Sequence, residues 1–345
     1  ANGGAGGRLC VEVGDVVGML DLGKLSRRYI GEAVEGSGLL SGERLGEIYA
    51  GLSTGYDRVF DVERTFGSCG SGTEQFIDVA HVAVHGEGAN QRVACADSDA
   101  GRVLIFNVES REFVCSVGES EGPGKLAGPC GVCFNDRGGL YVSDWSLNRI
   151  LVYDVDGSYV RGFGSWGSGN GQFYSPEGLA FGSEGEVVVA DCRNHRVQVL
   201  REDGTFVRSI GSYGQGEGMF QYPRDVAVGG DGSIVVADKG NHRVQVFTAG
   251  GEYVRSIGSE GNEAGQFLCP FGLAVGAGGE ILVADGDRND VQVFSSEGGL
   301  VQTIGANGDS EVDLDSPYGV CVDGEGNVFV SCEGQSGEGM VLMLS

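Results

Sequence analysis

A single spacing of 47 residues organises this chain. An aspartate that follows a small residue at the end of an apolar run recurs at this interval, at Asp97, Asp144, Asp191, Asp238 and Asp285, and Cys332 takes the same place a sixth time. Five of the six prolines keep the same interval. Self-similarity at a period of about 20–50 residues indicates a solenoid, a propeller or another repeat array. The spacing therefore constrains the fold before any local pattern is considered.

Glycine narrows the choice among repeat folds. It supplies 65 of the 345 residues, far above its usual share of about 7 %. The glycines lack the three-residue period of collagen and stand between apolar runs, which favours many short strands joined by tight turns. With 41 % hydrophobic residues the chain has enough apolar surface for a sizeable core. None of its apolar runs approaches the roughly 18 residues that span a bilayer.

Residues 176–211 display one repeat unit. Residues 176–181 form a short apolar run, and residues 186–191 form an unbroken β-branched run, as expected for a strand buried on both faces. Residues 195–200 alternate polar and apolar, which indicates a third strand, and residues 205–211 supply a fourth. Four strands joined by hairpin-length turns make one blade of a β-propeller.

The two ends of the repeat array predict how the ring closes. The last repeat has only three strand-like segments, at 317–322, 327–332 and 340–344. The missing fourth lies near the N-terminus, where the segment from Arg64 to Phe76 reproduces the segment from Arg208 to Phe220. A strand near residues 58–66 should therefore complete the final blade and protect its edge. The sequence predicts an all-β fold with six four-stranded blades.

Two copies of one motif suggest the family. Asn194-His195-Arg196-Val197-Gln198-Val199 and its counterpart beginning at Asn241 are each preceded by Ala-Asp and followed by a Val-Arg-Ser-Ile-Gly strand, and they resemble NHL repeats. Weaker copies begin at Asn148 and Asn289. The resemblance covers about residues 58–345 and implies a six-bladed β-propeller. NHL propellers serve as protein- or RNA-binding platforms, as sensor domains of bacterial kinases, and as a zinc-dependent lyase in peptide amidation. Fold alone does not choose among these roles.

Residues that recur in every blade are assigned to the scaffold. The repeated Asp ends the second strand and an Arg starts the third, at Arg102, Arg149, Arg196 and Arg243, so we expect a hydrogen bond or ion pair within each blade. His195 and His242 are equivalent residues one blade apart and are not expected to share a metal. The chain has only four histidines, whereas a catalytic zinc needs about three protein ligands. We therefore expect no metal and no cofactor. His81, which replaces a glycine of the Pro-x-Gly pattern, is expected to face the channel.

Functional candidates are positions that vary while the scaffold repeats. In such propellers the loops before the first strand and between the second and third strands gather on one face around the channel mouth, where binding residues usually lie. The predicted binding face comprises Glu177, Arg224, Phe271 and Tyr318 after the prolines, and Trp145, Arg193, Lys239 and Arg288 in the links. Aromatic and arginine side chains among acidic neighbours fit a contact surface for a protein or peptide.

The ten cysteines suggest no metal site. Cys133 and Cys321 stand where other repeats carry alanine, so we expect them to be small buried residues. Cys69 and Cys332 both adjoin strands of the final blade. They are candidates for a disulfide if the protein is secreted, with free thiols as the alternative. The sequence leaves the compartment open between a processed secreted or organellar protein and a cytoplasmic one.

The net charge of −26 bears on partners. Such a surface repels polyanions and disfavours nucleic acid as a partner. Residues 1–55 do not follow the repeat and are predicted to be a short mixed N-terminal extension, with the propeller in residues 56–345. Within the extension, residues 42–52 have one apolar helical face. The extension either packs on its own ring or docks on a second copy of the chain.

Three functional hypotheses follow. The first is a non-catalytic scaffold that binds a protein or peptide on the loop face around the channel. The second is a structural, self-assembling protein whose N-terminal arm in residues 1–55 links subunits into a homo-oligomer. The third is a metal-dependent lyase or hydrolase at the channel mouth, with a cation near Glu177 and Asp225. We favour the first, and with it a protein without enzyme activity.

Overall fold

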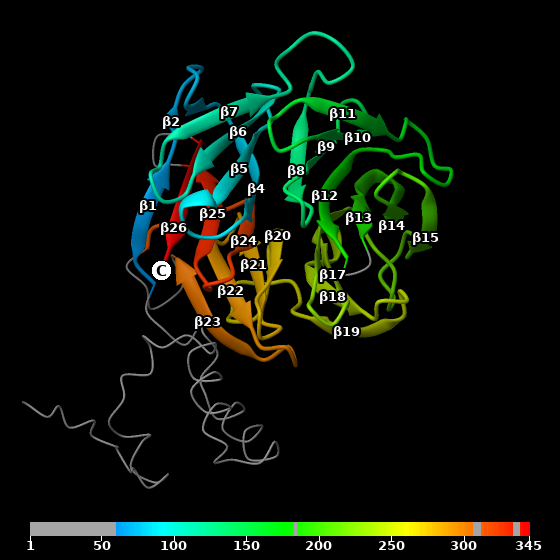
Figure 1. Ribbon diagram of the computed structural model, residues 1–345. Helices are drawn as coiled ribbons and strands as arrows, with labels where there is room; N and C mark the ends of the chain where they lie inside the picture. The colour runs from blue at the N-terminus through cyan, green and yellow to red at the C-terminus, as the bar shows by residue number, and fades with distance from the viewer. Residues whose placement is uncertain (1–59, 183–184, 306–311, 334–338) are drawn as a thin grey trace, which may run out of the picture. The chain divides into compact units, whose positions relative to one another are not determined.

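The computed structural model describes residues 60–182, 185–305, 312–333 and 339–345. Within these residues, six four-stranded antiparallel sheets stand as blades around a central channel (Figure 1). The predicted six-bladed all-β propeller is confirmed. No helix in this part of the chain is both long enough and apolar enough to cross a membrane. Residues 1–55 lie outside the described residues, so the predicted extension stays a prediction.

Each blade is formed by strands that follow one another in the chain, except in the last blade. Blade 1 comprises β4 (Val79–His85), β5 (Arg92–Asp97), β6 (Arg102–Asn107) and β7 (Phe113–Val117). Blade 2 comprises β8 (Pro129–Phe134), β9 (Leu140–Asp144), β10 (Arg149–Tyr153) and β11 (Tyr159–Phe163). Blade 3 comprises β12 (Pro176–Phe181), β13 (Glu186–Asp191), β14 (Arg196–Arg201) and β15 (Phe206–Ile210). Blade 4 comprises β16 (Pro223–Val228), β17 (Ile234–Asp238), β18 (Arg243–Phe247) and β19 (Tyr253–Ile257). Blade 5 comprises β20 (Pro270–Val275), β21 (Ile281–Asp285), β22 (Asp290–Phe294) and β23 (Leu300–Gly305). Blade 6 comprises β24 (Val320–Val322), β25 (Val328–Glu333), β26 (Gly339–Leu344) and β1 (Val62–Phe66). A short parallel pair outside the six sheets is formed by β2 (Ser68–Cys69) and β3 (Gln75–Phe76). Three 3₁₀ turns connect strands within blades 1, 3 and 4: η2 (Gly88–Asn90), η3 (Cys192–Asn194) and η4 (Lys239–Asn241).

The first strand of each blade lies next to the channel. These strands contact one another in order around the ring, from β4 through β8, β12, β16, β20 and β24 back to β4. The second strands are buried on both faces; in β13 every residue after Glu186 is buried. The unbroken β-branched pattern of these strands follows from that burial, since both faces contact other blades.

The closing strand lies where the sequence places it. β1 pairs antiparallel with β26, with Phe66 opposite Val341 (Figure 1). The Phe66 ring also packs against Phe329 of the same blade and Phe106 of blade 1, with ring centroids 6.2 Å apart in both pairs. The final blade is thus built from both ends of the propeller and covers an edge that would otherwise be open.

Glycine-rich loops connect each blade to the next by closing over a buried side chain. In blade 4 this side chain is Phe220, which is fully buried. Gly211 lies beside it with a φ of +81°, and a Cβ on this residue would come within 2.3 Å of the Phe220 ring. The position therefore requires glycine for both its backbone conformation and its lack of a side chain.

The repeated Asp and Arg form the predicted ion pairs in three blades. Arg Nε lies close to an Asp carboxylate oxygen in the pairs Arg102–Asp97 (3.2 Å), Arg196–Asp191 (2.8 Å) and Arg243–Asp238 (2.9 Å). In blade 2, Arg149 instead donates to the carbonyls of Pro123 and Lys125, at 3.2 and 3.3 Å. The repeated Asp also accepts from the loop that leads into its own blade, as Asp191 does from the backbone N–H of Tyr174 at 2.8 Å. The expected scaffold role is confirmed in these contacts.

The two repeat histidines connect neighbouring blades. His195 has a positive φ of 53°, and its Nδ1 accepts from the backbone N–H of Tyr222 at 3.1 Å. Nδ1 of His242 lies 2.7 Å from the carbonyl oxygen of Leu268, to which it donates. Burial lowers the pKa of His195, which agrees with an Nδ1 that accepts a hydrogen bond. Each ring therefore links its blade to the loop before the next one.

Candidate functional site

A cavity of about 1020 Å³ lies at the end of the channel where the first strands begin. Its lining comes from three kinds of segment: the starts of the first strands, the loops before them, and the links between the second and third strands. The volume is at the upper end of the range of about 300–1000 Å³ for small-molecule sites. These are the segments that the sequence predicts to gather on one face.

Seven of the eight predicted binding-face residues line this cavity. They are Trp145, Glu177, Arg193, Arg224, Lys239, Phe271 and Tyr318. Arg288 lies outside the lining, is only 4 % exposed, and donates from Nη2 to the carboxylate of Asp290 at 2.9 Å. It stands three residues after the repeated Asp, as Asn194 and Asn241 do. In blades 3 and 4 this position holds a scaffold residue. The distance of Arg288 from the repeated Asp therefore predicts a scaffold role for it as well.

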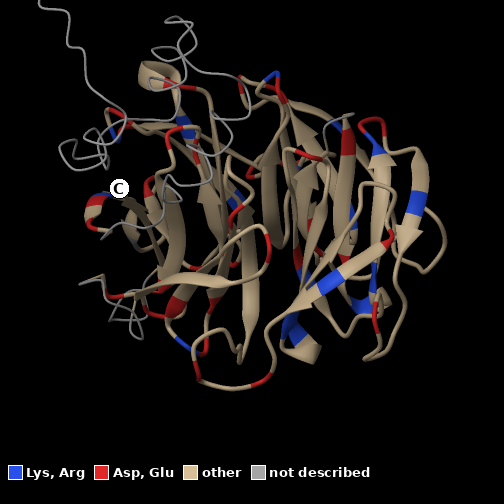
Figure 2. Cartoon of the chain, turned by 90° about the horizontal axis from the view of Figure 1, so that it is seen from below, with Lys and Arg blue, Asp and Glu red and all other residues tan. Residues whose placement is uncertain are grey.

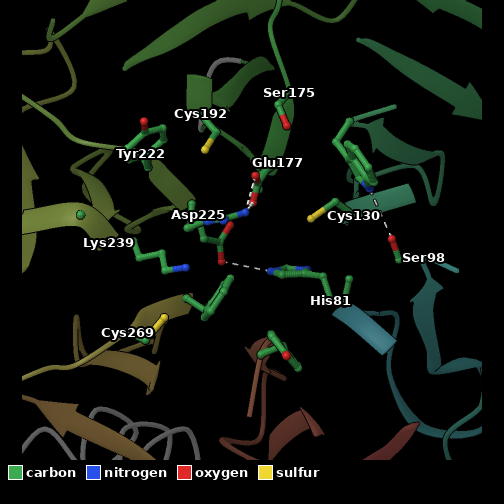
Figure 3. Close-up of a pocket in the computed structure, with 18 of the residues that line it drawn as sticks. His81, Ser98, Cys130, Ser175, Glu177, Cys192, Tyr222, Asp225, Lys239 and Cys269 are labelled. Atoms are coloured by element: carbon green, nitrogen blue, oxygen red, sulfur yellow. Dashed lines mark hydrogen bonds and ion pairs between the residues drawn. The ribbon is translucent and has the colours of Figure 1, made fainter. Parts of the chain in front are cut away.

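A histidine and an aspartate of the cavity lining meet across the channel. Nε2 of His81 lies 3.0 Å from Oδ2 of Asp225 (Figure 3). His81 belongs to β4 of blade 1 and Asp225 to β16 of blade 4, which are opposite each other in a ring of six. The prediction that His81 faces the channel is confirmed.

His81 and Asp225 occupy equivalent positions in their blades, and this position is a glycine in the other four blades. These glycines are Gly131, Gly178, Gly272 and Gly319. A Cβ on Gly178 would lie 1.8 Å from Oδ1 of Asp225, so the absence of a side chain there makes room for the aspartate. Of the six equivalent positions, two thus project side chains into the channel, and those two contact each other.

Asp225 is held by the backbone as well as by His81. Its Oδ1 accepts from its neighbour Val226 N–H at 2.8 Å, and its Oδ2 accepts from Leu273 N–H of blade 5 at 2.7 Å. The other ring nitrogen of His81, Nδ1, is buried and has no hydrogen-bond partner among the described residues. Because Nδ1 is covered, a ligand in the cavity does not reach it as a base in this arrangement.

An ion pair and an aromatic ring occupy one side of the cavity. The guanidinium of Arg224 binds the carboxylate of Glu177 and lies 5.1 Å from the ring centroid of Phe271. Although burial opposes the charge on Arg224, the carboxylate of Glu177 raises the pKa of this guanidinium. The ammonium of Lys239 lies 4.6 Å from the same Phe271 centroid, and Tyr318 packs edge-on against that ring at 5.1 Å. Phe271 is thus in contact with two cations and a second aromatic ring.

Exposed aromatic side chains line the rest of the cavity. Trp145 is 46 % exposed and Tyr222 is 48 % exposed. Arg193 lies over the ring of Tyr174 at 5.4 Å and donates to its hydroxyl at 3.3 Å. The sequence reasoning missed Tyr174 and Tyr222, which stand just before the prolines of blades 3 and 4. It identified the loops that line this cavity, but in those that precede the first strands it named only the residue after each proline.

The blade 1 side of the cavity is acidic. Burial, together with the nearby carboxylates of Asp99, Glu333 and Asp97, raises the pKa of Asp78 to about 6. Burial and the carboxylates of Glu333 and Asp78 raise the pKa of Tyr318 to about 12. These shifts report a concentration of negative charge where blades 6 and 1 meet. The sequence reasoning did not single out Asp78 or Asp99, both of which line the cavity.

The cysteines in the lining are not activated nucleophiles. Burial, followed by the carboxylate of Glu177, raises the pKa of both Cys130 and Cys192. A thiol with a raised pKa stays protonated and unreactive at neutral pH. Cys332 is buried at the end of β25. The side chain of Cys69 lies outside the described part of the structure, so the Cys69–Cys332 disulfide stays a prediction.

The carboxylates of the metal hypothesis already have protein partners. Glu177 binds Arg224, and Asp225 binds His81 and two backbone N–H groups. Across the described residues, no group of three or more His, Cys, Asp or Glu side chains has the arrangement of a metal site. A cation near Glu177 and Asp225 would therefore have to displace these partners.

Comparison with known proteins identifies repeats and fold. A family model described as the NHL repeat matches residues 173–200, 220–247 and 267–294. No curated protein matches the chain. Among solved structures, a streptogramin B lyase aligns with a TM-score of 0.59 at 14 % identity, covering 83 % of this chain and 98 % of that one. A gluconolactonase from Xanthomonas campestris aligns with a TM-score of 0.59 at 18 % identity, covering 79 % and 88 %.

A protein of unknown function from Bacteroides thetaiotaomicron aligns with a TM-score of 0.61 at 19 % identity, covering 83 % of this chain and 76 % of that one. Identities this low show that the fold is shared, and they do not show that any activity is shared. The matched repeats belong to blades 3 to 5 and have the same spacing as the aspartates of the other blades. This chain is thus a six-bladed β-propeller with a closing N-terminal strand, and its blades 3 to 5 contain NHL repeats.

Proposed function

We propose that this propeller is a binding protein that holds a peptide segment of a protein partner in the cavity at the channel mouth. The observation that carries the proposal is the lining itself. The positions that vary from blade to blade place a tryptophan, a phenylalanine, three tyrosines and three cations around one cavity. Tryptophan, tyrosine and arginine are the residues that most often dominate the free energy of binding at protein interfaces.

The polar groups of the cavity support binding rather than a reaction. Asp225 is saturated by His81 and the backbone, and Glu177 is neutralised by Arg224. The Nδ1 atom of His81 is covered. A general base must lie within hydrogen-bond reach of the proton that it takes, and these groups are engaged with each other. The exposed side chains of the lining include three aromatic ones, Trp145, Tyr174 and Tyr222, and aromatic residues are enriched in recognition sites.

An affinity selection tests this function. The full chain would be mixed with a synthetic library of short random peptides whose two termini are free, and retained peptides would be identified by mass spectrometry. A cavity variant would carry Trp145→Ser and Tyr222→Ser, both of which replace exposed side chains. We expect the wild-type chain to retain specific peptides and the variant to bind them at least about 30-fold more weakly, since each hot-spot side chain contributes about 2 kcal/mol.

The matched control carries Trp166→Ser and Tyr213→Ser. These aromatic side chains are 69 % and 66 % exposed and lie outside the cavity lining. The control should bind the retained peptides as the wild-type chain does. The proposal fails if the library yields no peptide above background, or if the cavity variant and the control lose affinity equally.

A further inference from the structure

Two cations of the cavity form no ion pair with a described carboxylate, although the chain has 49 acidic residues and only 23 basic ones. In Figure 2 most of the charged residues lie in the turns and at the strand ends of the propeller. Basic side chains of the blades commonly bind a carboxylate, as Arg243, Arg208 and Arg224 do. Lys239 and Arg193 are different, because each is placed over an aromatic ring instead.

Local structure directs Lys239 into the cavity. It begins η4, whose last residue, Asn241, is fixed by a hydrogen bond to Asp238 at 2.8 Å. Figure 3 shows the lysine side chain extending toward the centre of the cavity. The ammonium contacts the Phe271 ring at 4.6 Å and the Cys269 thiol, and an ammonium has three N–H donors. Donors therefore remain for a ligand.

Arg193 repeats this arrangement one blade earlier. It lies within η3, whose last residue, Asn194, donates to the carboxylate of Asp191 at 2.9 Å. Its guanidinium contacts the ring and the hydroxyl of Tyr174, which also lines the cavity. A guanidinium has five N–H donors in a planar fork that matches a carboxylate. Adjacent blades 3 and 4 thus each present to the cavity one cation that forms no ion pair with a described carboxylate.

The nearest carboxylates do not neutralise these two cations. Glu177 is paired with Arg224, and Asp225 is bonded to His81. Asp287 of blade 5 is exposed, so water and salt screen its charge. On the opposite side of the ring, blade 1 brings Asp78 and Asp99 to the lining. An anionic group is therefore attracted to blades 3 and 4 and repelled from blade 1.

We propose that Lys239 and Arg193 bind a carboxylate of the peptide that occupies the cavity. This inference rests on the proposed function and specifies the chemistry that the site selects. The carboxylate comes either from the free C-terminus of the peptide or from an Asp or Glu side chain. Hydrogen bonds in which both groups are charged are roughly twice as strong as neutral ones.

The test uses peptides retained in the selection described above. Each would be synthesised with a free or an amidated C-terminus, and with its Asp and Glu residues kept or replaced by Asn and Gln. Binding would be measured by fluorescence anisotropy to the wild-type chain and to Lys239→Gln. Uncharged residues occupy the equivalent position in blades 2 and 3, namely Trp145 and Cys192, so this variant is expected to fold.

We expect removal of the recognised carboxylate to weaken binding to the wild-type chain about 10-fold or more, which corresponds to about 1.4 kcal/mol. The Lys239→Gln variant should lose a similar factor and respond little to the same change in the peptide. Amidation and Asn or Gln replacement distinguish the two sources of the carboxylate. Lys125→Gln is the control, because Lys125 pairs with Glu121 outside the cavity lining and its loss should leave affinity unchanged.

The outcomes separate this inference from the proposed function. If retained peptides bind equally well after every carboxylate has been removed, the inference is wrong while peptide binding stands. Equal affinities of the wild-type chain and Lys239→Gln for acidic peptides would also overturn it. A selection that yields no peptide at all overturns the proposed function itself. A further variant, Lys239→Glu, should shift the selected peptides toward basic sequences, and an unchanged set would contradict the inference.

Discussion

In blade 4 the corner between the second and third strands is held by Asp238, and in blade 5 the equivalent corner is held by Asp285. Asp238 accepts from Arg243 at 2.9 Å, from Asn241 at 2.8 Å and from Gln245 at 3.0 Å. All of these partners are supplied by its own blade, and Arg243 starts the third strand.

Blade 5 differs from blade 4 in the charge of two of the side chains around the repeated Asp. Asp290 starts the third strand where blade 4 has an arginine, and Arg288 stands where blade 4 has Asn241. Nη1 of Arg288 lies 3.5 Å from the Gly261 carbonyl and 3.3 Å from the Glu263 carbonyl. The equivalent carbonyls of blade 4 are bound by an asparagine and an arginine. The guanidinium of Arg288 therefore contacts both carbonyls, which in blade 4 are bound by two separate side chains.

The comparison teaches that the repeat conserves interactions more strictly than residue types. Blade 5 keeps a cation in the corner, but it buries two carboxylates, Asp285 and Asp290, where blade 4 buries one. Burial raises the pKa of Asp285, and the charge of Asp290 raises it further. Since buried like charges are costly unless paired, blade 5 should depend more on its arginine than blade 4 does.

The largest effect is expected from Arg288→Met. This change removes the guanidinium that binds Asp290 and faces Asp285 inside the protein. Breaking a buried pair by removing one partner lowers the free energy of unfolding by about 3–5 kcal/mol. Urea denaturation monitored by tryptophan fluorescence would measure the loss. A loss below about 1 kcal/mol would show that the corner tolerates the removal of the guanidinium between its two carboxylates.

The same variant should be more pH-dependent than the wild-type chain. A carboxyl group whose folded-state pKa is raised binds its proton more tightly in the folded than in the unfolded protein. Its contribution to stability is therefore present at low pH and is lost as the pH rises through the folded-state pKa. Arg288→Met raises the pKa of Asp285 further, so its deficit should be larger at about pH 8 than at about pH 5. A deficit that grows on acidification would contradict this reasoning.

A smaller effect is expected from Arg243→Met in blade 4. Asp238 would keep its hydrogen bonds to Asn241, Gln245 and the backbone N–H of Gln221. A carboxylate that retains three donors loses part of its stabilisation, and we expect a cost of about 1–3 kcal/mol. The same urea measurement applies. Equal losses in blades 4 and 5 would remove the distinction between the two corners.

The smallest net effect is expected from the double substitution Arg288→Asn with Asp290→Arg. It gives blade 5 the asparagine and arginine of blade 4, so stability should lie within about 1 kcal/mol of wild type. Each single change should cost more, because Arg288→Asn leaves two carboxylates and Asp290→Arg brings two guanidinium groups together. A double-mutant cycle measures the coupling. Purely additive losses would mean that the exchanged residues do not replace one another.

Much of the fold could be predicted because each blade repeats the same local pattern. The 47-residue interval, the buried second strands and the closing strand each depend on short stretches of sequence, which β1 (Val62–Phe66) and β13 (Glu186–Asp191) illustrate. The Asp–Arg pairs were predictable for the same reason, since Asp191 and Arg196 face each other across one hairpin.

The candidate site could be predicted only in part. The varied positions lead to the cavity at the channel mouth, but the contact between His81 and Asp225 joins residues 144 positions apart. It exists only because a ring of six brings blade 1 opposite blade 4. The acidic group around Asp78 likewise depends on how blade 6 meets blade 1. Such contacts depend on the three-dimensional closure of the ring, which no single repeat encodes.

The His81–Asp225 contact also gives the ring an orientation. Six equivalent blades would offer an incoming peptide six indistinguishable ways to settle on the channel mouth. A contact along one diameter reduces the sixfold symmetry to twofold, and its two chemically different ends remove the remaining symmetry. With the acidic residues on the His81 side and Lys239 on the Asp225 side, each blade has a distinct place relative to a ligand. Under the proposed function, the two directions of a bound peptide are therefore not equivalent, although the protein is built by repetition.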